Sequence, residues 1–152
     1  MDDVSLLTLC AFQEAAGEPD DGVAAVARVV LNRMARHYVS DGTVAGTVLA
    51  PDQFSWTAWE MVDGRYERVC RSAEAVQARA AALLVRAQAL VRQWTRVGRI
   101  VGEVQGRAYA GADYDRLTDD TVLYLNPRLS HAVWATPAKR VCDIGRHSFF
   151  RA

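Results

Sequence analysis

The spacing of apolar side chains predicts two consecutive helices at the start of the chain. Residues 4–16 carry apolar side chains at helical intervals and then meet Gly17-Glu18-Pro19, where glycine and the residue before proline both oppose a helix. Asp20 and Asp21 then offer caps for a second helix of about fifteen residues, in which apolar positions recur three, four and seven residues apart. We therefore predict a first helix that ends near Gly17 and a second one that is deeply buried.

The rest of the chain gives a weaker pattern. Residues 38–66 are predicted to form loop with one short helix, because glycine, proline and clustered aromatic residues replace the periodicity. Ser72 opens the longest apolar stripe, which reaches residues 94–97 before Gly98 and predicts a central core helix. Residues 99–112 show no clear period. Residues 121–125 predict a short strand, and the aromatic end of the chain is expected to pack against the domain.

Composition narrows the class of protein. The chain has 152 residues, 51% of them hydrophobic and 24% charged, which fits one packed domain spanning residues 1–152. The formal net charge of +0 argues against nucleic acid as a partner, and no apolar stretch is long enough to predict membrane insertion. Cys10, Cys70 and Cys142 are far apart and have no neighbouring histidine at ligand spacing, so we expect buried thiols and neither disulfides nor a metal site.

Glu14 is the residue with the clearest chemical signal. It lies in the last turn of an otherwise apolar helix, where the helix dipole and apolar neighbours such as Phe12 both disfavour the ionised carboxylate and raise its pKa. A raised pKa suits a general acid that works near neutral pH. On composition alone, however, a glutamate such as Glu14 near a helix end is usually a solvated surface group, and Glu18 is more often a surface or capping residue.

Three ordered blocks then resemble the SleB/CwlJ cell wall hydrolases. The first is Glu14-Ala15-Ala16-Gly17-Glu18-Pro19 followed by Gly22 and the run 24–33, which is similar to that family's E-A-R-G-E-P, G and A-V-A-x-V-V-L-N-R. The second, residues 51–56, looks like Q-F-S-W, and the third resembles Y-x-N-P, W and I-G-x-H-x-F-y in residues 124–127, 134 and 144–151. Ala16 departs from the usual arginine.

The resemblance implies a mainly α, single lysozyme-like domain with minor β structure, acting on peptidoglycan glycan strands with no metal or organic cofactor. It also implies that Glu14 is the catalytic glutamate. The other motif residues are then expected to bind substrate, and these are Glu18, Gln53, Ser55, Trp56, Tyr124, Asn126 and His147. Trp56, or Trp59 beside it, is expected to form a platform for a sugar face. Purely structural roles stay open for Trp56 in the core, Asn126 in a turn and His147 in the tail.

The reaction that the resemblance favours is lytic transglycosylation of the bond between N-acetylmuramic acid (MurNAc) and N-acetylglucosamine (GlcNAc). In that reaction the muramic acid 6-hydroxyl is the nucleophile, so one glutamate suffices as acid and then base. A hydrolytic muramidase is the alternative, with a second carboxylate sought among Glu18, Asp52, Glu60 and Asp63. A noncatalytic glycan-binding or virion structural protein is the rival from another class.

The sequence also suggests where such an enzyme acts. Met1-Asp2-Asp3 starts the chain without the basic segment and long apolar core of a secretory signal. We therefore expect a phage or prophage endolysin that stays cytoplasmic until a holin releases it, or a hydrolase associated with phage particle components.

Overall fold

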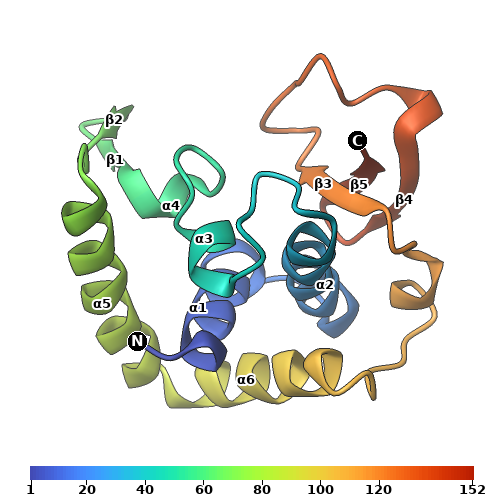
Figure 1. Cartoon of the computed structure of the whole chain (residues 1–152), viewed down its shortest axis with the longest axis horizontal. Coiled ribbons are helices and arrows are strands. Elements are labelled where there is room, and N and C mark those ends of the chain that lie inside the picture. The colour runs from blue at the N-terminus through green and yellow to red at the C-terminus, as the bar shows by residue number, and fades with distance from the viewer.

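The computed structural model describes all residues from 1 to 152, and it places two buried helices at the centre of the molecule (Figure 1). Helix α1 spans Asp3–Ala15 and α2 spans Asp20–Arg36, which confirms the two predicted helices. Asp2 caps α1 by accepting a hydrogen bond from the Ser5 amide, while Pro19 occupies the N-cap position of α2 and Asp20 and Asp21 lie in its first turn.

Helix α2 is central because it is buried on two sides. One side packs with α1 and with α6 (Val91–Gln105) in the main apolar cluster. The other side presents Ala25 and Val29 to Cys142, Ile144 and Phe149 of a three-stranded sheet. Apolar residues on both sides explain why the sequence of α2 reads as almost continuously buried.

The sheet is formed by the C-terminal third of the chain. Strands β3 (Thr121–Leu125), β4 (Arg140–Ile144) and β5 (His147–Arg151) pair antiparallel in the order β3-β5-β4, which confirms the predicted strand and the packed tail. The short 3-10 turns η1 (Tyr114–Arg116) and η2 (Pro137–Lys139) precede β3 and β4. The β3–β5 register shifts between Thr121 and Leu123, which leaves a bulge at Val122.

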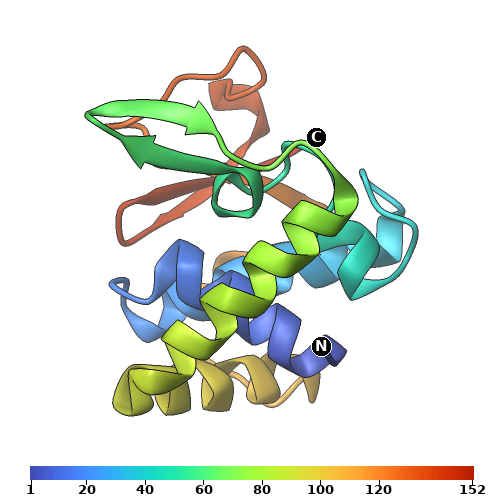
Figure 2. The same cartoon turned by 90° about the vertical axis from the view of Figure 1, so that its left-hand side faces the viewer.

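The middle of the chain differs from the prediction. Residues 38–66 form two short helices, α3 (Val44–Val48) and α4 (Ser55–Ala58), and the first strand of a hairpin, β1 (Trp59–Val62) with β2 (Arg65–Arg68). Helix α5 (Ala73–Ala89) is capped by Ser72 as expected, but it ends at Leu90, and α6 continues through Gly98 to Gln105. Only Ala80 and Ala87 of α5 are buried, so this helix covers the outside of the core (Figure 2).

Two findings complete the fold. All three cysteines are buried free thiols, as predicted. None of the helices combines the length and apolarity needed to cross a bilayer.

The β4–β5 turn depends on a glycine. Gly145 has φ +57, and a Cβ at this position would lie 2.1 Å from Glu18 Oε2 and 3.1 Å from Pro19 Cδ. We expect Gly145→Ala to lower the free energy of unfolding by roughly 2 kcal/mol or more, since it combines left-handed backbone strain with this close contact. Urea denaturation measures the loss.

Gly64 supplies the matched control for that substitution. It also has a positive φ, +77, but a Cβ there meets nothing within 4 Å. Gly64→Ala should therefore show the backbone strain alone, about 1 kcal/mol. Equal losses in the two variants would contradict the steric role of Glu18.

Candidate functional site

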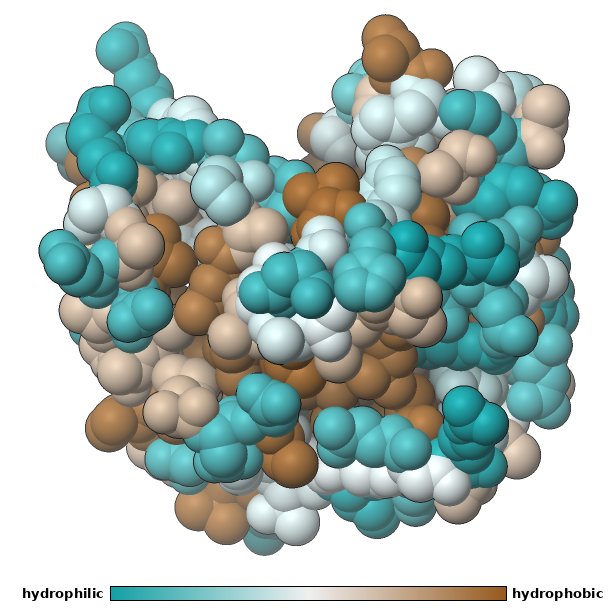
Figure 3. Space-filling view, viewed as in Figure 1, coloured by the Kyte–Doolittle hydropathy of each residue, from teal (hydrophilic) through white to brown (hydrophobic).

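An open groove crosses the molecule between the β1–β2 hairpin and the loop that follows β3. The surface is visibly hollowed there (Figure 3), and the groove has a volume of ≈ 880 Å³. Its walls come from segments far apart in sequence, namely the end of α1, the last turn of α2, residues 52–66, residues 124–130 and His147 at the start of β5. Six of the eight predicted site residues line it: Glu14, Gln53, Ser55, Tyr124, Asn126 and His147.

Glu14 is the half-buried acidic group of the groove, whereas Asp52 is exposed. Tyr124 of β3 donates a hydrogen bond of 2.6 Å from its hydroxyl to Glu14 Oε2. Burial raises the pKa of Glu14, while the Tyr124 hydrogen bond and the Arg33 charge partly oppose that rise. The expected direction of the pKa shift is confirmed, although Phe12 packs against Trp94, 6.0 Å away between ring centroids. The carboxyl group is thus held in place and biased toward its protonated form.

Aromatic contacts hold Tyr124 against the sheet. Its ring lies edge-on to His147, 5.2 Å between centroids, and 5.6 Å from Phe149. His147 has a side chain only 12% exposed, and burial lowers its pKa. Its Nδ1 is buried without a hydrogen-bond partner and lies 3.9 Å from Glu18 Oε1. His147 is therefore neutral at neutral pH and supports Tyr124 from the neighbouring strand.

The amide and hydroxyl groups of the groove differ in the hydrogen bonds that they already make within the protein. Gln53 Oε1 faces an Arg33 guanidinium N–H at 3.5 Å, and its Nε2 donates to the Pro51 carbonyl at 3.3 Å. Asn126 Oδ1 accepts from the Arg128 amide, which uses its oxygen but leaves its Nδ2 donors. Ser55 is exposed at the start of α4. These groups suit hydrogen bonding to a polar ligand.

Glu18 lies outside the groove, contrary to the expectation that it binds substrate. Its side chain is 4% exposed and accepts hydrogen bonds from the Arg146 amide at 3.1 Å and from Arg146 Nε at 2.8 Å. Burial alone would raise the pKa of Glu18, but these hydrogen bonds outweigh it and lower the pKa. Glu18 therefore joins the start of α2 to the β4–β5 turn.

Trp56 also lies outside the groove, although it is among the residues expected to bind substrate. It is 7% exposed and belongs to the main apolar cluster, because helix α4 turns its side chain inward. Trp59, three residues further on, lines the groove instead. Its Nε1 donates to Asp52 Oδ1 at 3.2 Å, and the Arg68 guanidinium lies 5.0 Å from its ring centroid. The predicted aromatic platform is thus available from Trp59.

Arg33 is the charged residue of the groove that the sequence did not predict as part of the site. It is 5% exposed, and its Nε donates to the Val122 carbonyl at 2.6 Å. Its guanidinium stacks 5.2 Å from the Phe54 ring centroid and makes no ion pair with a carboxylate within 4.0 Å. A charged residue on the apolar side of a buried helix was the signal for it.

Removing the Tyr124 hydroxyl tests how its hydrogen bond affects the pKa of Glu14. Tyr124→Phe removes the donor that stabilises the charged form of Glu14, so the pKa of Glu14 should rise further. An activity that needs protonated Glu14 would then persist to higher pH, while the rate at the optimum falls about tenfold because positioning is lost. A pH–rate profile measures both effects.

Tyr109→Phe is the matched control. The Tyr109 hydroxyl donates a bond of similar length, 2.7 Å, to Asp21, outside the groove. Its removal should leave the alkaline limb of the profile unchanged. An unchanged limb in Tyr124→Phe would refute the coupling to Glu14.

Comparisons with known proteins agree with this geometry. The model of the Cell Wall Hydrolase family matches residues 17–150, a segment that begins just after the helix carrying Glu14. This confirms the resemblance seen in the motifs. Comparison with curated protein sequences yields no match.

Two solved structures share the fold. One is the catalytic domain of the germination-specific lytic transglycosylase SleB from Bacillus anthracis, with 19% identity, a TM-score of 0.58, and coverage of 98% of this chain and 93% of that one. The other is the catalytic domain of the Bacillus cereus SleB protein, with 20% identity, a TM-score of 0.54, and coverage of 98% and 89%. The likeness confirms the predicted mainly helical fold with a minor sheet.

Proposed function

The chain belongs to the cell wall hydrolase family, and on that premise we propose that it cleaves the MurNAc–GlcNAc bond of peptidoglycan as a lytic transglycosylase. The observation that carries the proposal is Glu14, a half-buried carboxyl group with a raised pKa that lines an open groove and accepts a hydrogen bond from Tyr124. The solved SleB domain named as a lytic transglycosylase supports the choice of reaction.

The proposed reaction uses Glu14 twice. Protonated Glu14 donates its proton to the glycosidic oxygen as the bond to C1 of the muramic acid breaks. The resulting carboxylate, stabilised by the Tyr124 hydroxyl and the nearby Arg33 charge, then takes the proton of the 6-hydroxyl as that oxygen bonds to C1. The product is a 1,6-anhydro ring, and no water is consumed.

Groove side chains suit a glycan strand in this position. Gln53, Ser55 and Asn126 present amide and hydroxyl groups for acetamido and hydroxyl substituents. Trp59 offers an apolar ring for a sugar face. The setting in which the enzyme acts, phage lysis or cell-wall penetration, stays a prediction of the sequence.

Hydrolytic muramidase is the second candidate because Asp52 lines the same groove. Of the four carboxylates considered as a second catalytic group, it is the one that does so. Its Oδ1 accepts hydrogen bonds from Trp59 and Arg68, which fix the position of the carboxyl group that would serve as base or nucleophile. In this reaction water replaces the 6-hydroxyl.

Mass spectrometry of the products from purified peptidoglycan separates the candidates. Anhydro products, lighter than hydrolytic ones by one water, support the transglycosylase. Reducing ends of full mass that disappear in Asp52→Asn would establish the muramidase. Binding of glycan strands with no products of either kind would leave the noncatalytic reading.

A further inference from the structure

A second cavity lies beside the groove and shares a wall with it. It has a volume of ≈ 420 Å³ and is formed over the β4–β5 pair and the loop after β3. His147 lines both cavities. The loop after β3 also contributes to both cavities. Asn126 and Leu129 line the groove, whereas Pro127 and Arg128 line the second cavity.

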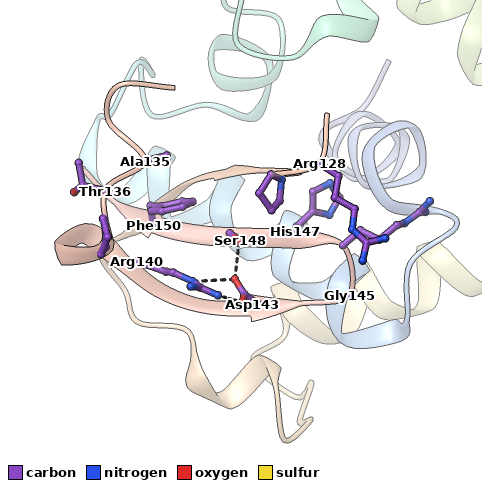
Figure 4. A pocket seen from close by; sticks show the side chains of 12 residues that line it. Arg128, Ala135, Thr136, Arg140, Asp143, Gly145, His147, Ser148 and Phe150 are labelled. Carbon is purple, nitrogen blue, oxygen red and sulfur yellow. Dashed lines mark hydrogen bonds and ion pairs between the residues drawn. The ribbon is translucent and has the colours of Figure 1, made fainter. Parts of the chain in front are cut away.

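The second cavity is rich in arginine. Arg128, Arg140 and Arg146 line it, against a single carboxylate, Asp143 (Figure 4). Asp143 is already engaged, because its Oδ1 accepts from Arg140 Nε at 3.0 Å and from Ser148 Oγ at 2.6 Å. The charge of Arg140 is therefore neutralised within the cavity.

Two guanidinium groups remain available to a ligand. Arg128 is exposed, forms no ion pair, and lies with His147 at the end of the cavity near Gly145 (Figure 4). Arg146 uses its Nε for Glu18 Oε1, but its side chain is 62% exposed and its terminal nitrogens make no hydrogen bond. Planar guanidinium groups bind carboxylates with two parallel hydrogen bonds.

The position of this charge relative to the groove identifies a ligand. Peptidoglycan strands carry stem peptides on the lactyl group of muramic acid, and these peptides bear free carboxylates. Because His147 and residues 126–129 form the wall between the two cavities, a stem peptide that leaves the groove over this wall would enter the second cavity. We propose that the second cavity binds the carboxylates of a peptidoglycan stem peptide through Arg128 and Arg146, next to the strand held in the groove. This proposal rests on the proposed function.

Two forms of one substrate test the contact. Peptidoglycan freed of wall polymers, and therefore of phosphate, is compared with the same material after an amidase has removed the stem peptides. Arg128→Gln should lower kcat/KM about fivefold on the stem-bearing substrate, mainly through KM, and by less than twofold on bare strands, because it removes one exposed charge contact. Arg128→Lys should lie between the wild type and Arg128→Gln.

Arg92→Gln is the matched control, since Arg92 is exposed on α6 and lines neither cavity. It should leave both substrates unaffected. Equal effects of Arg128→Gln on the two substrates, or none on either, overturn the stem contact while leaving the proposed reaction intact. An effect seen only when phosphate-bearing wall polymers are retained would assign the cavity to phosphate and also overturn the proposal. A wild type that cleaves neither substrate would refute the proposed function itself.

Discussion

Replacing Glu14 by glutamine is expected to lower the rate of glycan cleavage by at least about a thousandfold. The amide keeps the shape of the side chain and an oxygen that can accept the Tyr124 hydrogen bond, but it cannot supply a proton to the leaving oxygen. Release of soluble muropeptides from purified peptidoglycan measures the rate. Because the fold is preserved, binding to insoluble peptidoglycan should be retained.

Glu74→Gln is the control for that substitution. Glu74 is exposed in the first turn of α5 and does not line the groove, so its variant should cleave like the wild type. A Glu14→Gln protein that keeps more than about a tenth of the wild-type rate would contradict a general acid. Loss of binding along with cleavage would instead indicate misfolding.

The same substitution has a defined effect on stability. Burial raises the pKa of Glu14 above its ordinary value, so the folded state binds this proton more tightly than the unfolded state. The stabilisation from the protonated group is complete below the unfolded pKa and is lost as the pH rises through the folded pKa. At neutral pH Glu14→Gln should therefore melt at a higher temperature than the wild type, and the difference should vanish below about pH 4.

Local sequence signals were sufficient to predict helix boundaries that are set by residues close together in the sequence. The break at Gly17-Glu18-Pro19 predicted the end of α1, and with it the position of Glu14 in the last turn. The capping serine Ser72 predicted the start of α5. The apolar stripe after it did not reveal the break at Leu90, because both halves continue the same helical periodicity.

The candidate site depended on contacts that no local pattern contains. Tyr124 and Glu14 are 110 residues apart, and the motifs that suggested both residues say nothing of their hydrogen bond. The motif that contains Glu14 places Glu18 among the expected groove residues, but the turn between the helices directs it to Arg146. Glu14 and Glu18 therefore have opposite pKa shifts.

Arg33 is expected to have the largest effect on stability. Arg33→Ala leaves the carbonyl of Val122 without its donor at the β3 bulge, removes the contact with Phe54 and opens a cavity beside α2. Together these losses should lower the free energy of unfolding by about 3 kcal/mol. Urea denaturation measures it, and Arg33→Met should lose less because it fills most of the space.

Arg36→Ala is the matched control on the same helix. Arg36 Nε also donates to a backbone carbonyl just before β3, that of Asp119 at 2.9 Å, but this contact is exposed. It should cost less than about 1 kcal/mol. Similar losses for Arg36→Ala and Arg33→Ala would show that burial of the Arg33 contact does not matter.

The activity of the Arg33 variants tests whether the Arg33 hydrogen bond at the β3 bulge positions Tyr124. Val122 lies two residues before Tyr124 on β3, so the Arg33 hydrogen bond fixes the strand that brings the Tyr124 hydroxyl to Glu14. Arg33→Ala and Arg33→Met should then both lose at least tenfold in kcat at 20 °C, where both are folded, although their stabilities differ. The alkaline limb of their pH–rate profiles should move to higher pH, because the Arg33 charge and the Tyr124 hydrogen bond both lower the pKa of Glu14. Wild-type kcat in Arg33→Met would show that Tyr124 is positioned by the sheet alone.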